Sequence, residues 1–203
     1  MLPYSDFYLR NQAKARSLGK KIINYFVLRS LNRTFACRIM MLELHNVTIG
    51  QLVRSFSLTA GDGQLVTLTG APGSGKTTLL RAILGLIPVD GGHISIDGEL
   101  LTPLSAPYFR RHIAYVPQHL SLPEGYEVMG LEQWGIMSGD ERYLLLLNNA
   151  ISTGKPLLIV DEPSQPVSAD TMETIDRTLM EAADKGVTVL AVNSRILKNQ
   201  IQL

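Results

Sequence analysis

The chain has 203 residues, 45% of them hydrophobic, and a formal net charge of +1 at pH 7, values typical of one soluble globular domain with an appendage. Cys37 is the only cysteine, which excludes an intrachain disulfide and a cysteine metal cluster and suits a reducing cytosol. The longest apolar stretch of the N-terminal region, residues 22–31, is interrupted by Asn24 and Arg29 and is too short to span a bilayer.

The charge is distributed unevenly along the chain. Residues 1–39 carry eight Lys or Arg and one acid, Asp6, which gives this segment +7 and the remainder −6. One interpretation is a basic amphipathic helix on an anionic membrane surface, and the favoured one is that translation starts at Met40 or Met41. We therefore expect a basic extension over 1–39, without site residues, and the functional domain over 40–203. The apolar stripe of the first interpretation consists of Leu18, Ile22, Tyr25 and Phe26.

From residue 41 onward, alternating polarity, apolar runs and turn signals predict an ordered series of elements. Strands alternating with helices after a strand-rich start favour an α/β fold with a mainly parallel sheet and an antiparallel β portion. The predicted elements, in chain order, are strands at 42–47 and 52–58, a turn at 61–63, a strand at 64–69, a helix with the stripe Leu79, Leu80, Ile83 and Leu84, a turn at 88–92, a strand at 93–96, a tight turn at 97–98, a strand at 110–116, a helix at 143–149, a strand at 157–160, a helix at 172–183 and a strand at 187–192.

A complete Walker A loop lies between the strand at 64–69 and the helix that follows. Its glycines let several backbone N–H groups converge on phosphate oxygens, and the helix N-terminus adds a partial positive charge. Lys76 is expected to reach the β and γ phosphates and Thr77 to ligate Mg²⁺. A Gly-rich surface turn is the alternative, which the strand–loop–helix context disfavours. The predicted phosphate-binding residues are Gly70, Ala71, Pro72, Gly73, Ser74, Gly75, Lys76, Thr77 and Thr78.

A pair of acids follows the apolar strand at 157–160. Asp161 and Glu162 are therefore expected at the carboxyl edge of the sheet, where ligands bind in open α/β folds. Alone, such a pair is more often a solvated strand end. Together with the Walker A loop it is interpreted as a Walker B motif, with Asp161 holding Mg²⁺ and Glu162 polarising the attacking water.

At this point the chain resembles the ATP-binding cassette (ABC) ATPases over nearly all of residues 41–195. The resemblance rests on five strings that occur in the order typical of the family. They are GAPGSGKTTLLRAILGL, PVDGGHISIDGELL, FRRHIAYVPQ, MSGDER and KPLLIVDEPS. The resemblance implies a P-loop NTPase fold with a helical subdomain between the Walker motifs.

The resemblance also implies roles for individual residues. Gln118 falls at the family's Q-loop glutamine, which ligates Mg²⁺ and links the site to the transmembrane partner. Glu162 falls at the catalytic base. Ser138 and Gly139 fall in the signature motif, which caps the γ phosphate of ATP held by the opposing subunit. With Lys76, these residues define an ATPase that uses ATP and Mg²⁺.

The family further implies the partners and the location. We expect a nucleotide-binding subunit of an ABC transporter, peripheral on the cytoplasmic face of the membrane. It would work with a separate transmembrane subunit and a second cassette, in a homodimer or a heterodimer. Nucleic acid is not an expected partner, because the −6 charge outside the N-terminal segment disfavours contact with phosphate backbones.

The signature region departs from the family pattern LSGGQ. It is Met137-Ser138-Gly139-Asp140-Glu141, so two carboxylates are expected close to the partner's anionic ATP, where they would weaken dimer closure. Ser138 also has an ordinary structural interpretation as the N-cap of the following helix. Ser138 lies only 20 positions after Gln118, which predicts a reduced helical subdomain within 119–137.

Two further departures concern ATP itself. The family's switch histidine is replaced by Asn193-Ser194, and loss of one preorganised transition-state donor costs about 10²–10³ in rate, which predicts slow hydrolysis. No aromatic residue lies near Gly50-Gln51, where the family often stacks adenine. Two alternatives therefore stay open. They are a degenerate regulatory cassette in a heterodimer and a soluble, non-transport ABC ATPase.

Overall fold

The computed structural model describes residues 40–61, 63–119, 136–163, 167–192 and 200–203. All of them belong to one compact unit, residues 39–203. The predicted extension over 1–39 and most of the predicted reduced subdomain, residues 120–135, lie outside the described residues. No helix among the described residues is long and apolar enough to cross a lipid bilayer.

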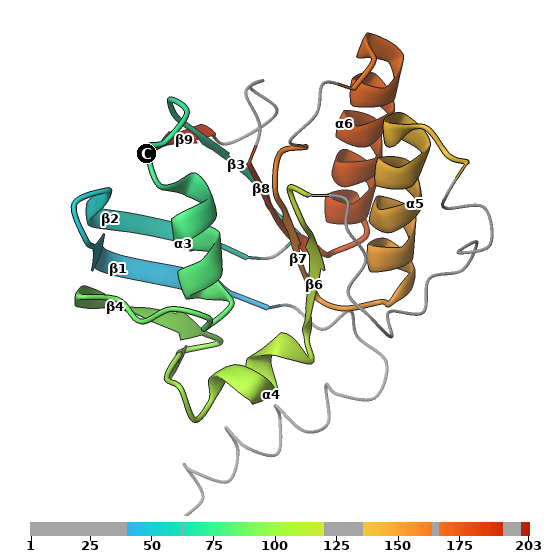
Figure 1. Cartoon of the computed structure of the whole chain (residues 1–203). Helices are drawn as coiled ribbons and strands as arrows, with labels where there is room; N and C mark the ends of the chain where they lie inside the picture. Colours follow the sequence, from blue (N-terminus) through green and yellow to red (C-terminus); the bar gives the residue numbers. More distant parts are fainter. Residues whose placement is uncertain (1–39, 62, 120–135, 164–166, 193–199) are drawn as a thin grey trace, which may run out of the picture. The chain divides into compact units, whose positions relative to one another are not determined.

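Two sheets organise the unit (Figure 1). The first is antiparallel, with the order β2-β1-β4-β5, and the second is parallel, with the order β6-β7-β8-β3-β9. This arrangement confirms the predicted fold class. The strands are β1 Leu42–Ile49, β2 Val53–Ala60, β3 Leu65–Thr69, β4 Gly91–Ile96, β5 Glu99–Leu100, β6 Ile113–Val116, β7 Leu157–Val160, β8 Thr188–Val192 and β9 Gln200–Gln202.

Among the described residues, four helices cover the sheets. Figure 1 shows α5 and α6 side by side against one face of the parallel sheet, while α3 shares its core with the antiparallel sheet on the other face. The predicted helices at 143–149 and 172–183 are confirmed and are several residues longer than expected. The helices are α3 Lys76–Ile83, α4 Ala106–Arg110, α5 Gly139–Ser152 and α6 Ala169–Asp184.

The apolar strands of the parallel sheet are buried on both faces because successive side chains point to opposite sides. In β7, Leu157 and Ile159 join the core shared with α3 and the antiparallel sheet. Leu158 and Val160 join the second core, under α5 and α6. This double burial explains why the continuous apolar run at 157–160 forms a strand, and it fixes which face each helix covers.

The strand predicted at 110–116 is wrong in its first three residues, since β6 begins at Ile113 and Arg110 ends α4. Helix α4 was not predicted. It has five residues, of which Ala106 and Phe109 are buried, too few for a recognisable helical period. Ser105 starts it by exchanging hydrogen bonds with Thr102, and proline is tolerated at its second position.

The start of β4 and the last strand also differ from the prediction. Gly91 and Gly92, predicted in a turn, open strand β4, where a Cβ at Gly92 (φ 72°) would collide with the backbone oxygens of His45 and Asn46. Close approach of β1 and β4 therefore requires this glycine. Strand β9 was not predicted, because its three residues include two glutamines, and it forms only by pairing with β3.

Candidate functional site

The Walker A loop joins the carboxyl end of β3 to the N-terminus of α3. The cap residue of α3 is Gly75, whose left-handed conformation (φ 99°) suits glycine, and its Cβ position lies 3.0–3.1 Å from side-chain atoms of Leu52 and Val53. No described side chain caps α3, and its first turn contains no acid. The N–H groups at this helix end are thus arranged to bind an anion.

Lys76 is the first residue of α3, and its side chain folds back over the preceding loop. Its Nζ donates to the carbonyl oxygens of Gly70 and Ala71, both at 2.8 Å. A cation is therefore held beside the N–H groups of the α3 N-terminus. The two carbonyl bonds anchor the ammonium without neutralising its charge, because carbonyl oxygens carry only partial charges.

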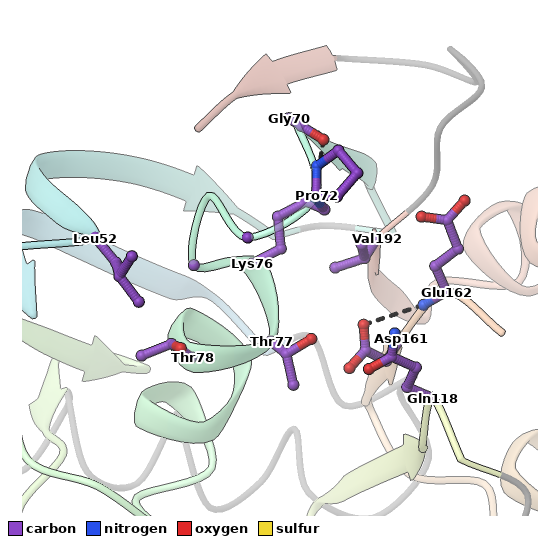
Figure 2. A pocket seen from close by; sticks show the side chains of 12 residues that line it. Leu52, Gly70, Pro72, Lys76, Thr77, Thr78, Gln118, Asp161, Glu162 and Val192 are labelled. Atoms are coloured by element: carbon purple, nitrogen blue, oxygen red, sulfur yellow. Dashed lines mark hydrogen bonds between the residues drawn. The ribbon is translucent and has the colours of Figure 1, made fainter. Parts of the chain in front are cut away.

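A pocket of about 500 Å³ opens at this point, a volume suited to a small organic ligand (Figure 2). Figure 2 shows Gln118, Asp161 and Glu162 on one side of it and the loop and α3, with Lys76 and Thr77, on the other. The carboxyl ends of β3, β6, β7 and β8 meet at this edge of the parallel sheet. The lining residues are Leu52, Gly70, Pro72, Gly73, Gly75, Lys76, Thr77, Thr78, Gln118, Asp161, Glu162 and Val192.

The structure gathers most of the predicted site residues at this pocket and leaves four outside its lining. Ala71 does not line it but holds Lys76 through its carbonyl oxygen. Ser74 has a buried hydroxyl without a hydrogen-bond partner among the described residues. Ser138 and Gly139 begin α5 and do not line the pocket. The predicted switch position, Asn193-Ser194, lies outside the described residues.

Sequence reasoning missed two apolar residues of the lining, Leu52 and Val192. Leu52 is 56% exposed and lies in the turn between two strands of the antiparallel sheet, so no local pattern connects it with the loop. Val192 is the last residue of β8, and its position at the carboxyl edge could have been inferred from the parallel order of the strands.

Asp161 is the most deeply buried acid of the site, with 1% of its surface exposed. Its Oδ1 accepts a hydrogen bond from the Glu162 N–H at 3.1 Å, while Oδ2 is buried without a hydrogen-bond partner among the described residues. Burial raises the pKa of Asp161, and the Thr77 hydroxyl and the Glu162 N–H oppose this shift. A buried carboxylate oxygen without a partner is a ready ligand for a hard cation.

The described residues contain no group of three or more His, Cys, Asp or Glu side chains that could hold a metal ion. A cation at this pocket would therefore rely on a mixed set of oxygens. Thr77 supplies a hydroxyl, Gln118 an amide oxygen and Asp161 a carboxylate, and all three line the pocket. This combination fits Mg²⁺, which is usually bound by one or two carboxylates together with phosphates and waters.

The N-terminus of α5 differs from that of α3. Ser138 caps it, as predicted, and forms a capping box with Glu141, in which the Ser138 N–H and hydroxyl donate to Glu141 Oε2 at 2.8 and 2.9 Å. Asp140 Oδ2 accepts from the Ser168 N–H at 3.0 Å and the Thr171 hydroxyl at 2.9 Å, at the start of α6. These bonds keep the pKa values of Asp140 and Glu141 below their usual range.

Comparison with known proteins agrees with this geometry. Residues 53–134 match the family model described as ABC transporter. An ABC transporter ATP-binding protein of Haemophilus influenzae is 33% identical over 168 residues, covering 63% of this chain and 64% of that protein. A zinc import ATP-binding protein of Marinobacter nauticus is 27% identical, covering 71% of this chain and 64% of that protein. The chain thus spans under two thirds of the length of these relatives.

Solved structures support the same fold. A dimeric bacterial ABC transporter cassette has a TM-score of 0.66 at 21% identity, covering 80% of this chain and 94% of that chain. A cassette in a post-hydrolysis state, bound to ADP and Pi, has a TM-score of 0.63 at 22% identity, with the same coverage. The family model and the relatives support an ABC ATPase nucleotide-binding domain in this chain, and the solved structures, at 21–22% identity, support the fold alone.

Proposed function

We propose that this chain is the nucleotide-binding subunit of an ABC transporter, which binds ATP with Mg²⁺ and hydrolyses it slowly. The observation that carries the proposal is the pocket of about 500 Å³, where the Walker A loop, Gln118, Asp161 and Glu162 face one another. Relatives named as ATP-binding proteins of transporters support the assignment.

In the proposed complex the loop and the α3 N-terminus hold the phosphates of ATP. Lys76 would exchange its bonds to the Gly70 and Ala71 carbonyls for bonds to the β and γ phosphate oxygens. The exchange favours ATP because an anionic phosphate oxygen attracts the ammonium more strongly than a neutral carbonyl oxygen does. The N–H groups at the glycine-capped helix end add further donors.

Thr77, Asp161 and Gln118 are the residues that would hold Mg²⁺ beside the phosphates. The unpartnered Asp161 Oδ2 supports this role, because a buried anion without a partner is costly unless a cation neutralises it. When bound, Mg²⁺ supplies positive charge that neutralises the phosphate oxygens.

Glu162 is proposed as the base for hydrolysis. It lines the pocket one residue after Asp161, and its carboxylate would accept a proton from a water aligned with the γ phosphorus. The water attacks as the bond to the β-phosphate oxygen breaks, giving ADP and phosphate. Slow turnover is proposed because Asn193 and Ser194 carry no cation to stabilise the leaving charge.

Leu52 is proposed to contact the nucleobase. It lies at the edge of the pocket, in the β1–β2 turn beside Gly75, and more than half of its surface is exposed. An aliphatic contact gives less stabilisation than an aromatic stack, which is worth about 1–3 kcal/mol per base. Moderate nucleotide affinity is therefore expected.

The proposal includes a membrane partner. The cassette would lie on the cytoplasmic face of the membrane and contact a separate transmembrane subunit. A second cassette, identical or different, would complete the dimer, as in the dimeric structural neighbour.

The α5 N-terminus favours a second candidate, a regulatory cassette in a heterodimer. The Ser138 N–H and hydroxyl, which the family resemblance assigns to a partner's γ phosphate, are both bonded to Glu141. The adjacent Asp140 adds a second negative charge. Such a cassette would bind its own ATP while giving little help to the ATP of the opposing subunit.

ATP hydrolysis by the purified full chain, with ATP affinity measured in parallel, tests the proposal. Glu162→Gln is expected to lower the rate about 10²–10⁴-fold, the contribution of a general base, and to leave affinity unchanged. Glu181→Gln on the exposed side of α6 is the matched control and should change neither value. Binding without any effect of Glu162→Gln on turnover would favour the regulatory candidate, and absence of nucleotide binding would contradict both.

A further inference from the structure

Tyr143 connects α5 to the acidic pair of the pocket. Its side chain is 1% exposed, and its hydroxyl donates a hydrogen bond to the backbone carbonyl oxygen of Asp161 at 2.9 Å. The ring packs in the core under α5 and α6. Tyr143 does not line the pocket, so any influence on a ligand there passes through the Asp161 backbone.

The peptide between Asp161 and Glu162 has a partner for each of its polar groups. Its carbonyl accepts from Tyr143, and its N–H donates to Asp161 Oδ1 at 3.1 Å. One end of the peptide is thus tied to α5 and the other to the carboxylate itself. Because Oδ1 is engaged by this peptide, Oδ2 is left as the buried oxygen without a partner among the described residues.

We propose that Tyr143 is a positioning residue for the divalent cation that accompanies the nucleotide: it fixes the Asp161–Glu162 peptide and thereby the carboxylate oxygen that faces the cation. The inference rests on the proposed function, since it assumes that nucleotide and cation bind in this pocket. Without the phenol, the carbonyl would be buried without its donor and the peptide would lose one of its two restraints.

The first turn of α5 reinforces this arrangement. Asp140, three residues before Tyr143, binds the Ser168 N–H and the Thr171 hydroxyl at the start of α6. The helix that carries Tyr143 is therefore tied to a neighbouring helix as well as to Asp161. A donor held in this way loses little conformational freedom when it restrains the peptide.

The test is the affinity of a fluorescent N-methylanthraniloyl ATP for the full chain, measured with and without Mg²⁺. The dissociation constant without Mg²⁺ divided by the one with Mg²⁺ reports how much the cation strengthens nucleotide binding. Tyr143→Phe should reduce this ratio about 10–100-fold, the usual effect of losing a group that orients a metal ligand, and leave Mg²⁺-free affinity unchanged. A purely structural role would weaken both affinities together.

Tyr115→Phe is the matched control. Tyr115 lies on β6 and is half-buried, and burial together with the Asp161 charge raises its pKa, so it is a second phenol near the same acid. No hydrogen bond joins it to the Asp161 carbonyl in the described residues, and its variant should keep the full Mg²⁺ ratio. An unchanged ratio in Tyr143→Phe, or an equal loss in Tyr115→Phe, would overturn the proposal.

Tyr143→4-aminophenylalanine keeps the ring and a weaker donor, and we expect it to give an intermediate ratio. It serves as the test if Tyr143→Phe does not fold, and equal losses of affinity with and without Mg²⁺ in this folded variant would then overturn the proposal. If the wild-type chain binds no nucleotide, the proposed function fails as well. If it binds nucleotide but its affinity does not respond to Mg²⁺, the proposed Mg²⁺ site and the role of Tyr143 are overturned, while nucleotide binding in the pocket stands.

Discussion

The N-termini of α3 and α5 are capped in opposite ways. Gly75 ends the loop before α3 without a side-chain cap and without an acid in the first turn. Ser138 caps α5, and Asp140 and Glu141 fill its first turn. A helix N-terminus that binds a ligand keeps its backbone N–H groups available. A helix N-terminus with a structural role bonds these groups to side chains of the same chain.

The carboxylates of the two regions also lie in different environments and have opposite pKa shifts. Beside α3, the Asp161 carboxylate is buried with one oxygen unpartnered, and burial raises its pKa. At α5, hydrogen bonds lower the pKa values of Asp140 and Glu141. The pocket thus carries an electrostatic cost that a cation can relieve, whereas the carboxylates at the α5 N-terminus are stabilised by hydrogen bonds within the chain. Such costs are commonly concentrated at functional sites.

The largest effect on ATP affinity is expected at Lys76. Lys76→Ala should weaken ATP binding about 30-fold or more, because truncating one member of a buried charged pair costs about 2–5 kcal/mol. Lys155→Ala is the matched control, since Lys155 also donates to a backbone carbonyl, that of Ile113, but lies outside the pocket. A fluorescent nucleotide titration measures both, and equal losses in the two variants would remove the distinction between the pocket and the rest of the fold.

The buried carboxylate of Asp161 is expected to lower the stability of the folded chain at neutral pH. Its raised folded-state pKa means that the native chain binds more protons than the unfolded chain above pH 4, so stability falls as pH rises through the folded pKa. Asp161→Asn should therefore raise Tm at pH 7 by about 2–4 °C, the shift that about 1 kcal/mol gives a chain of this size. The gain should shrink as pH approaches 4. Thermal melts between pH 4 and 7 measure it, and a lower Tm at pH 7 would refute the account of this acid.

Ser138 is expected to stabilise α5, which it caps, without contributing to ATP binding by the same chain. Ser138→Ala is expected to cost about 1 kcal/mol, or about 2–4 °C in Tm, without changing the chain's affinity for ATP. Ser152→Ala, which removes a hydroxyl bonded to Asn148 at the other end of α5, provides the comparison. Weaker ATP binding in Ser138→Ala would show that the α5 N-terminus takes part in the chain's own site.

The smallest effect is expected at Asp140, whose pKa shift has the sign opposite to that of Asp161. Its folded pKa lies below the unfolded value, so its contribution is present above about pH 4 and is lost as pH falls through the folded pKa. Asp140→Asn should lower Tm slightly at pH 7, and the difference from wild type should vanish in acid. A difference that grows on acidification would contradict this sign.

Local patterns predicted the pocket well, because a loop of consecutive residues and two strand ends suffice to build it. Lys76 and Thr77 follow from the loop sequence, and Asp161 follows from the parallel order of strands, which brings their carboxyl ends together. Leu52 was missed because it reaches the pocket from the other sheet. The Tyr143–Asp161 and Asp140–Ser168 bonds were missed because they join elements 18 and 28 residues apart.

Backbone amide NMR during titration of the ¹⁵N-labelled full chain with ATP and Mg²⁺ would test the contrast between the two helix ends most directly. The account predicts large shifts for the N–H groups of Gly75, Lys76 and Thr77, and little change at Gly139 and Asp140. Saturable shifts confined to α5, or none at α3, would contradict it.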